Sequence, residues 1–546
     1  MDRRGLTGGS MPLAVLFVVS AGIIAYRAYA QDLTIDETDT YQWFVAALDP
    51  DQWIPAANNH LLNTLLMRAS IALFDVSPFT LRLPAVLGGV AYAAAAAMLA
   101  AVMAGAAQAL RRVCLFAALV LNPFVLEYLV AARGYAPALA CEMGILLLLF
   151  RDLAGPAGTE ERAGEDPAAR PLAAVSLLAG VAVAANYSFL LTVSTLVGLY
   201  FLALAAGLPA GRRPPARAVL SAGLRLFGPM AAVLVLLCGH NIVNMPQEQV
   251  DVGWGTTSLG GMVSSMAELT FIAPNPFVVP PHLLPVFAGV SAAAPALFLL
   301  LFLAGAGGVA WRLAGRRREP GAVDGRTLFA GLLLAAVVLA VAAHLFLYVA
   351  LGVKLPRSRT GIHLVPLLSL VAAFPLYAAP GVFPRRVAAA ALVPAALVAA
   401  SFAASLRFSH FQEWKWNADV CAAVEVAGEY AARHGVARVE SSWEHVSAGN
   451  FYREYLGYGF APMELVPDEA IRTDGTVYIL SRRAGALAPQ LGLTPIWVSN
   501  LAGTIVAVRD AAAVPGFARD RIPLASRCHA HAWYPDANFY PGPHIY

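Results

Sequence analysis

The stretch Leu33-Thr-Ile-Asp-Glu-Thr-Asp-Thr-Tyr-Gln-Trp-Phe44 follows the apolar run from Met11 to Tyr26. Its position decides how the whole chain is interpreted. The apolar run is long enough to cross a bilayer, for which roughly 17–25 residues are needed. Arg3 and Arg4 precede it, and basic flanks stay on the cytoplasmic side. We therefore expect the acidic pair Asp36–Glu37 at the far membrane surface, where a carboxylate suggests chemistry on a lipid-borne substrate.

The composition excludes an ordinary soluble protein. Of the 546 residues, 59% are hydrophobic and only 13% are charged, which is typical of a polytopic membrane protein. The first apolar run lacks a small-residue cleavage site, so we interpret it as a retained anchor. The 5 cysteines are too few for a disulfide scaffold, and Cys114, Cys141 and Cys238 fall in apolar runs as expected core residues.

Apolar runs predict about eleven transmembrane helices. They are 11–29, 82–104, 112–129, 134–150, 171–186, 188–208, 218–240, 284–306, 327–350, 362–380 and 387–406.

Basic residues orient these spans. One side collects Arg111, Arg112, Arg151, Arg162, Arg170, Arg212, Arg213, Arg217, Arg312, Arg316 to Arg318, Arg385 and Arg386. By the positive-inside rule that side is cytoplasmic, as is the amino terminus. We predict a plasma (inner) membrane protein with a transmembrane domain over 1–406, whose first extracytoplasmic loop is 30–81. Residues 407–546 then form a periplasmic or extracellular domain.

The composition of 407–546 changes to that of a small α/β domain. A helix is expected from Gln412 to His434, ended by Gly435, with another around Asn450 to Leu456. Strands are expected at Val436–Glu440, Val477–Leu480 and Thr504–Val508, and irregular coil from Cys528 to Tyr546. Whether Cys421 and Cys528 pair stays open.

Several basic residues lie at the outer face against the positive-inside rule. They are Arg68, Arg82, Arg133, Lys354, Arg357 and Arg359. Guanidinium donors match phosphate oxygens bidentately, so we favour an anion held at this surface over pairing with loop carboxylates or lipid headgroups.

Other polar residues fall in the same layer. Asn59 and His60 begin an apolar stretch that looks re-entrant or interfacial, and Glu127 ends the third span. Asp36, Glu37, His60 and Glu127 could together bind a divalent cation, which the sequence does not require. Glu142 lies inside a span, where an ionisable group is costly and usually paired or functional. We expect His344 and His363 to be helix-end histidines.

The arrangement of these residues along the chain resembles that of the GT-C class of membrane glycosyltransferases, and within it that of glycosyltransferase family 39. That family includes protein O-mannosyltransferases and lipid A aminoarabinose transferases. The matching pieces are Asp36-Glu37 with Tyr41, Arg82-Leu-Pro-Ala-Val-Leu-Gly-Gly89, Arg133-Gly-Tyr135, Pro356-Arg-Ser-Arg359 before Pro366, and Asn450-Phe-Tyr-Arg453. Where relatives often carry His-Pro-Pro or Lys-Pro-Pro, this chain has Asn59-His60-Leu-Leu.

The resemblance implies a GT-C-like helical bundle and inverting transfer of a sugar from a polyprenyl-phosphate donor to an extracytoplasmic hydroxyl of a lipid, glycan or protein. It makes Asp36 the general base, with Glu37 supporting it or binding the acceptor. The phosphate candidates are Arg82, Arg133, Arg357 and Arg359, with Asn59, His60, Glu127, Tyr135 and Lys354 completing the substrate site. No nucleotide or nucleic acid is required.

Two other classes stay open. A transporter or flippase for lipid-linked sugars would favour internal repeats and charges at the midplane. The sequence displays no repeat, and most of its charges lie at one face. A non-enzymatic envelope assembly protein would depend on its outer domain and would tolerate the loss of Asp36 and Arg357.

Overall fold

The computed structural model describes residues 11–46, 56, 58–104, 108–154, 170–208, 214–244, 255–272, 274–275, 278–315, 324–379, 382–499, 501–509 and 528. The predicted coil after Cys528 lies outside these residues, as do Arg162, Arg212, Arg213 and Arg316 to Arg318. The chain forms two compact units. The membrane unit comprises Met1–Ile24, Pro55–Asn63 and Pro84–Leu406, and the carboxy-terminal unit comprises Ala25–Ile54, Thr64–Leu83 and Arg407–Tyr546.

Within the described residues, 7 helices are long and apolar enough to cross a bilayer. Helices satisfy their own backbone hydrogen bonds, which hydrocarbon demands. These spans are Met11–Ala30 (α2), Pro78–Ala104 (α5), Tyr187–Ala205 (η4 with α11), Ala216–Asn244 (α12), Ala294–Ala314 (in α16), Gly325–Leu351 (α17) and Arg385–Ser405 (α20 with α21). The protein is therefore a multi-pass membrane protein.

Two predicted spans are interrupted. The region 112–129 divides into α6 (Ala109–Val120) and α7 (Pro123–Tyr128). Pro123 has no N–H to donate, so a new helix begins there, capped by the Asn122 side chain. The region 362–380 divides into η6 (Ser358–Leu364), α18 (Val365–Ala372) and α19 (Phe374–Tyr377).

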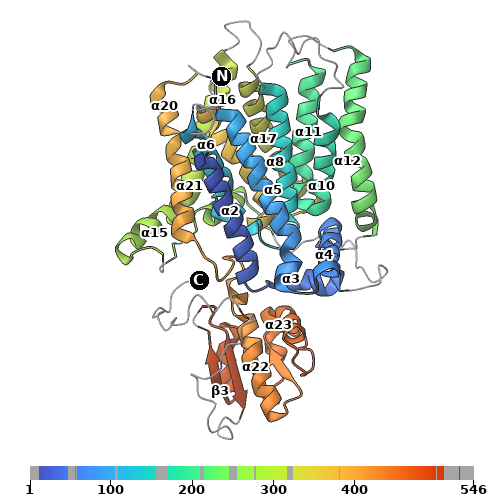
Figure 1. Ribbon diagram of the computed structural model, residues 1–546, viewed down its shortest axis with the longest axis vertical. Helices are drawn as coiled ribbons and strands as arrows, with labels where there is room; N and C mark the ends of the chain where they lie inside the picture. The colour runs from blue at the N-terminus through green and yellow to red at the C-terminus, as the bar shows by residue number, and fades with distance from the viewer. Residues whose placement is uncertain are drawn as a thin grey trace. The chain divides into compact units, whose positions relative to one another are not determined.

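Two more predicted spans form helices that are not among the 7 candidate membrane spans. The region 134–150 forms α8 (Tyr135–Ala154), which carries Glu142, Arg151 and Asp152, and 171–186 forms the shorter α10 (Leu172–Ala185). Helix α10 contacts both α8 and α12, and α17 contacts α8 and α11, as Figure 1 shows for these neighbouring helices.

Small residues let these helices approach closely. A Cβ at Gly88 of α5 would lie 2.6 Å from the Pro137 backbone nitrogen of α8, and one at Gly89 would lie 2.8 Å from the Leu129 carbonyl oxygen. Helices in membranes pack most tightly across such small residues. The pair Gly88-Gly89 therefore seats α5 against the segment that leads into α8.

Short elements join the long helices of the membrane unit. They include the two halves of the interrupted spans, α14 (Leu259–Thr270), η5 (Pro281–Leu283) and α15 (Leu284–Ala292). Helix α14 packs against η6 and α7. Helix α14 lies outside every predicted span.

The carboxy-terminal unit contains the α/β domain and the first predicted loop except for Pro55–Asn63, which belongs to the membrane unit. Its amino-terminal part includes α3 (Ile35–Thr40), the π-helix η1 (Tyr41–Val45) and most of α4 (Leu61–Phe74). Its later helices are η7 (Lys415–Asn417), α22 (Val420–His434), α23 (Trp443–Leu456), η8 (Asp468–Ala470), η9 (Ala484–Ala486) and α24 (Leu487–Gln490).

Four strands form one sheet in the order β1-β2-β4-β3. They are β1 (Val439–Ser441), β2 (Val477–Leu480), β3 (Leu493–Val498) and β4 (Ile505–Arg509). Strands β1 and β2 are parallel, and β4 is antiparallel to both β2 and β3. Helix α22 packs on β2 and β4.

The elements predicted for this domain are largely confirmed. Helix α22 begins later than expected but ends at Gly435, whose φ of 62° is the left-handed conformation that glycine favours. Strand β2 has the predicted bounds, and β1 and β4 are shifted by a few residues. Cys421 and Cys528 form a disulfide, and the other cysteines are buried thiols.

Candidate active site

The acidic pair lies on α3, whose start is set by local sequence. Thr34 and Glu37 form a capping box: the Thr34 hydroxyl accepts from the Glu37 N–H at 3.2 Å, and the Glu37 carboxylate accepts from the Thr34 N–H at 2.9 Å. Such reciprocal bonds satisfy donors that a helix start leaves unpaired. Helix α3 is therefore fixed at its first turn by the Thr-x-x-Glu pattern.

Glu37 is locked by Arg82 from the start of α5. The Arg82 Nε and Nη2 donate to the two carboxylate oxygens of Glu37 at 2.8 and 2.7 Å, and both side chains are 0% exposed. The same guanidinium donates to the carbonyls of Gln31 and Asp32 at 2.6 and 2.8 Å, and it lies over the Phe411 ring. Protein oxygens thus occupy Arg82, so we propose it as a support of Glu37 in place of the expected phosphate contact.

Asp36 differs from its neighbour in exposure. It is partly exposed, whereas Glu37 is fully buried. Asp36 is therefore the more exposed residue of the pair, although its Oδ2 is buried, while Glu37 holds the start of the helix.

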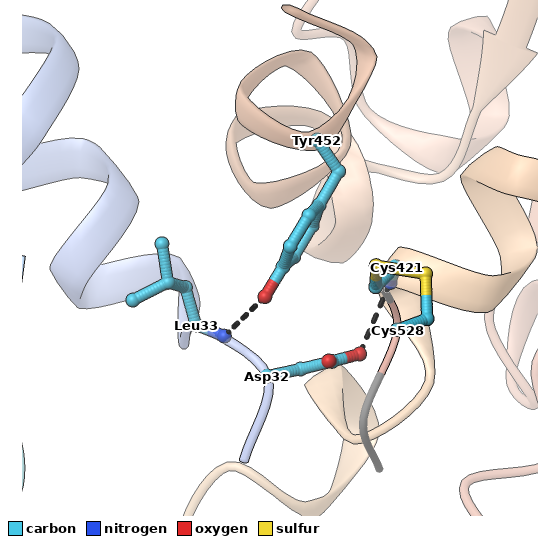
Figure 2. Close-up of a disulfide and its surroundings, with 5 residues drawn as sticks. All are labelled: Asp32, Leu33, Cys421, Tyr452 and Cys528. Carbon is cyan, nitrogen blue, oxygen red and sulfur yellow. Dashed lines mark hydrogen bonds between the residues drawn. A yellow bond between two sulfur atoms is a disulfide. The ribbon is translucent and has the colours of Figure 1, made fainter. Parts of the chain in front are cut away.

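A third carboxylate, Asp32, was not singled out in the sequence. It is buried, and its Oδ2 accepts from the Cys421 N–H at 3.0 Å beside the disulfide (Figure 2). Burial raises the pKa of Asp32 from 3.8 to about 8, against the lowering effect of that hydrogen bond. The folded protein therefore favours the protonated carboxyl, so its contribution to stability is present at acidic pH and is lost as pH rises through about 8.

In the membrane unit, Arg133 lies in a turn built by asparagines. Its side chain is 4% exposed and donates to the Asn58 side chain, and its carbonyl accepts from Asn186 at 3.2 Å. The preceding carbonyl of Ala132 accepts from Asn63 at 3.2 Å. The turn continues through Gly134, at a φ of 78°, into Tyr135 of α8.

Asn59 and His60 join the same region through α12. Asn241 donates to the Asn59 carbonyl at 2.9 Å and to the Tyr187 hydroxyl at 3.1 Å, and the His60 ring meets Tyr187 edge to face. Burial, followed by the Arg133 charge, lowers the pKa of His60 to about 3. His60 is therefore a neutral imidazole beside Arg133. Asn241 and Tyr187 had no motif that could have marked them.

Hydrogen bonds to neighbouring segments hold the part of the chain that carries Lys354, Arg357 and Arg359. Leu355 and Thr256 exchange backbone hydrogen bonds at 3.0 and 2.9 Å, and the Ser358 N–H donates to the Ser265 hydroxyl of α14 at 2.9 Å. Ser358 has a φ of 49°, which is uncommon for a residue other than glycine.

Packing places the elements that carry Arg359 and Glu127 against each other. Element η6, which carries Arg359, contacts α7, which carries Glu127, and η4, which carries Tyr187. Glu127 is buried. Arg68 instead belongs to the carboxy-terminal unit, where its Nε donates to the Val45 carbonyl at 3.0 Å.

The remaining polar residues either contact other side chains within the membrane unit or are buried in a helix. His363 Nδ1 and the Thr192 hydroxyl share a hydrogen bond at 2.7 Å, and the His363 ring stacks on His344. Glu142 is 0% exposed in α8. Among the described residues, no group of three or more His, Cys, Asp or Glu side chains is placed to hold a metal ion.

A small apolar crevice of about 60 Å³ lies between α6, α14, α16, α18 and α21. Phe271, Phe298 and Leu368 line it, and Asn122 and Thr270 form a polar part of its wall. Asn122 also caps α7, so the crevice adjoins the helix that carries Glu127.

Substituting Gly134 by Ala should destabilise the Arg133 turn. A Cβ there would overlap the Ala185 carbonyl oxygen, in addition to the roughly 1–2 kcal/mol that a left-handed conformation costs an L-residue. We expect a clear fall in the thermal unfolding midpoint of the purified protein. Gly352→Ala is the matched control, because Gly352 has a φ of 72° but open space around it. Equal effects of the two changes would contradict the close packing at Gly134.

No protein-family model matches this chain, and no curated protein matches it. Among solved structures, the chain is similar to ArnT from Cupriavidus metallidurans, with 14% identity, 92% of this chain and 99% of that chain covered, and a TM-score of 0.39. It is also similar to the oligosaccharyltransferase AglB from Archaeoglobus fulgidus, with 11% identity, 92% and 75% coverage and a TM-score of 0.44. A third is the arabinofuranosyltransferase AftD from Mycobacteria, with 14% identity, 91% and 40% coverage and a TM-score of 0.43.

Proposed function

We propose that the protein is a GT-C-type membrane glycosyltransferase that transfers a sugar from a polyprenyl-phosphate donor to a hydroxyl outside the cytoplasm, with inversion. The observation that carries the proposal is the division within the acidic pair. Glu37 is buried against Arg82, while Asp36 on the same helical turn is partly exposed. This arrangement supplies one rigidly supported carboxylate to an incoming hydroxyl.

In this reaction Asp36 removes the proton of the acceptor hydroxyl. The acceptor oxygen then bonds to the anomeric carbon as the bond from that carbon to the phosphate oxygen breaks, and the proton stays on the Asp36 carboxyl. A general base within hydrogen-bond reach contributes about 10²–10⁴-fold to such a step. Glu37 and Arg82 act through Asp36 by holding α3.

The leaving phosphate gains negative charge, which fixed cations stabilise best in a site that excludes water. We assign this role to Arg133, Lys354, Arg357 and Arg359, with Asn59, His60, Glu127 and Tyr135 as surrounding substrate residues. The neutral state of His60 suits a hydrogen-bonding role toward the phosphate or sugar. The apolar crevice of the membrane unit has the character that an isoprenoid chain requires.

The orientation completes the proposal. We propose that the amino terminus lies in the cytoplasm and the carboxy-terminal domain lies outside the plasma (inner) membrane, because the positive-inside rule assigns the side richer in basic residues to the cytoplasm. A disulfide within that domain suits an oxidising compartment.

Donor consumption tests the proposed function. Purified protein is incubated with host lipid extract and envelope acceptors, and polyprenyl-phosphate sugars are followed by mass spectrometry, with the Asp36→Asn protein as control. We expect one lipid-linked sugar to disappear only with the wild-type protein, and its mass then identifies the sugar. If folded protein consumes none of them, the transferase proposal is wrong, and transport or assembly becomes the better interpretation.

Substitutions at Ser358 test whether the segment Lys354–Arg359 holds the donor phosphate. Ser358→Gly relieves the left-handed strain and should bind undecaprenyl phosphate, the lipid bound in a structure of Cupriavidus metallidurans ArnT, as the wild type does. Ser358→Val should bind it at least several-fold more weakly, because a β-branched residue at positive φ costs roughly 1–3 kcal/mol. Isothermal titration measures both affinities. Equal binding by the two variants would remove Lys354–Arg359 from the phosphate site.

A further inference from the structure

The helix that carries the acidic pair cannot hold its own position. Helix α3 has 6 residues, and isolated helices shorter than about 12–15 residues are marginal in water. The capping box fixes its first turn but not its direction. Contacts from outside the helix must therefore set where Asp36 points.

Those contacts come from the α/β domain. The Tyr452 hydroxyl of α23 accepts from the Leu33 N–H at 2.8 Å (Figure 2), and the Asn417 Oδ1 accepts from the Ile35 N–H at 3.0 Å. The Ile35 N–H is one of the donors that a helix start leaves unpaired. Tyr452 and Asn417 thus flank the capping residue Thr34 on both sides.

Both acceptors are themselves held rigidly. Tyr452 and Asn417 are each 1% exposed, and the Asn417 amide donates to the Glu444 carbonyl of α23 at 3.0 Å. Asp32, one residue before Leu33, accepts from the Cys421 N–H at the start of α22. Figure 2 shows both contacts of this short segment: the Asp32 carboxylate reaches Cys421 of α22, and the Tyr452 hydroxyl of α23 reaches the Leu33 N–H.

A second set of contacts fixes the other end of α3. The Ser447 hydroxyl of α23 donates to the Asp39 carboxylate, and the Ser447 carbonyl accepts from the Gln42 side chain at 2.8 Å. Tyr41 meets Phe451 of α23 edge to face. Helix α23 therefore lies along α3 over the length of the acidic segment.

We propose that the carboxy-terminal α/β domain positions the catalytic base, with Tyr452, Asn417 and Ser447 as positioning residues for Asp36. This inference rests on the proposed function. It assigns the domain a task inside the reaction, in addition to any recognition of the acceptor. A displacement of about 1 Å in such a site can cost on the order of a hundredfold in rate.

Tyr452→Phe tests the proposal, because it removes one acceptor oxygen and keeps the ring. We expect kcat to fall on the order of 10–100-fold, while KM for the donor and the affinity for undecaprenyl phosphate stay unchanged. Hydrogen exchange of the segment 31–42 should become faster. Tyr458→Phe is the matched control, since Tyr458 lies in the same domain and its hydroxyl bonds Glu429.

The outcomes separate the two proposals. Wild-type kcat and exchange in Tyr452→Phe, together with inactive Asp36→Asn, would overturn the positioning role and leave the transferase standing. An active Asp36→Asn protein would overturn the assignment of the base itself. If Tyr452→Phe fails to fold, Ser447→Ala replaces it, and Ser447→Thr should restore kcat by returning the hydroxyl to Asp39. Failure of Ser447→Ala to lower kcat would then overturn the proposal.

Discussion

Asp36→Asn should lower kcat by about 10²–10⁴-fold and leave donor binding unchanged. The amide has nearly the shape of the carboxylate but cannot take the acceptor proton. Because Glu37 and Arg82 hold α3 without using the Asp36 position, the variant should fold as the wild type does. Turnover of the lipid-linked donor measures kcat, and titration with undecaprenyl phosphate measures binding.

Asp75→Asn is the matched control for this change. Asp75 lies before α5 with a φ of 62°, a conformation that asparagine adopts readily. It should keep wild-type turnover. If Asp36→Asn keeps its activity as well, another group is the base, and the exposure of Asp36 has no catalytic meaning.

Arg82→Met should destabilise the protein by about 3–5 kcal/mol, because it leaves the Glu37 carboxylate buried without its counter-ion. The carbonyls of Gln31 and Asp32 lose their donors in the same change. The free energy of unfolding in denaturant reports the loss. Adding Glu37→Gln to Arg82→Met should recover part of it, since the buried charge is then absent.

Arg438→Met gives the comparison at the surface. Arg438 bonds Glu464 at 3.1 Å, but the two side chains are 52% and 59% exposed. Exposed pairs contribute about 0–1 kcal/mol. Similar losses in Arg82→Met and Arg438→Met would contradict the internal ion pair and return Arg82 to the phosphate candidates.

The sheet illustrates where sequence patterns reach their limit. Strand β2 is an apolar run buried along its length, and its bounds were predicted. Strand β3 was missed because Pro495 interrupts Leu493-Thr-Pro-Ile-Trp-Val498, and a proline argues against a central strand. The sheet accommodates it by placing β3 at the edge, with a register shift between Pro495 and Trp497.

The interrupted spans illustrate the same limit in the membrane unit. Hydropathy alone does not distinguish one continuous helix from two short helices, so residues 112–129 were predicted as one span. The break at Asn122-Pro123 follows from backbone chemistry visible in the sequence. The placement of α7 against α14 and η6 does not, because it depends on packing between residues far apart in the chain.

The sequence by itself determined the multi-pass membrane character and the α/β composition of the last domain. Each depends on residues within a few positions of one another, whose hydropathy or hydrogen bonding acts locally. Only the tertiary structure decided that Glu37 pairs with Arg82, that Cys421 pairs with Cys528, and that the first loop is held by Tyr452, 419 residues from Leu33. Such contacts form between distant segments, and their partners are chosen by the packing of the whole chain.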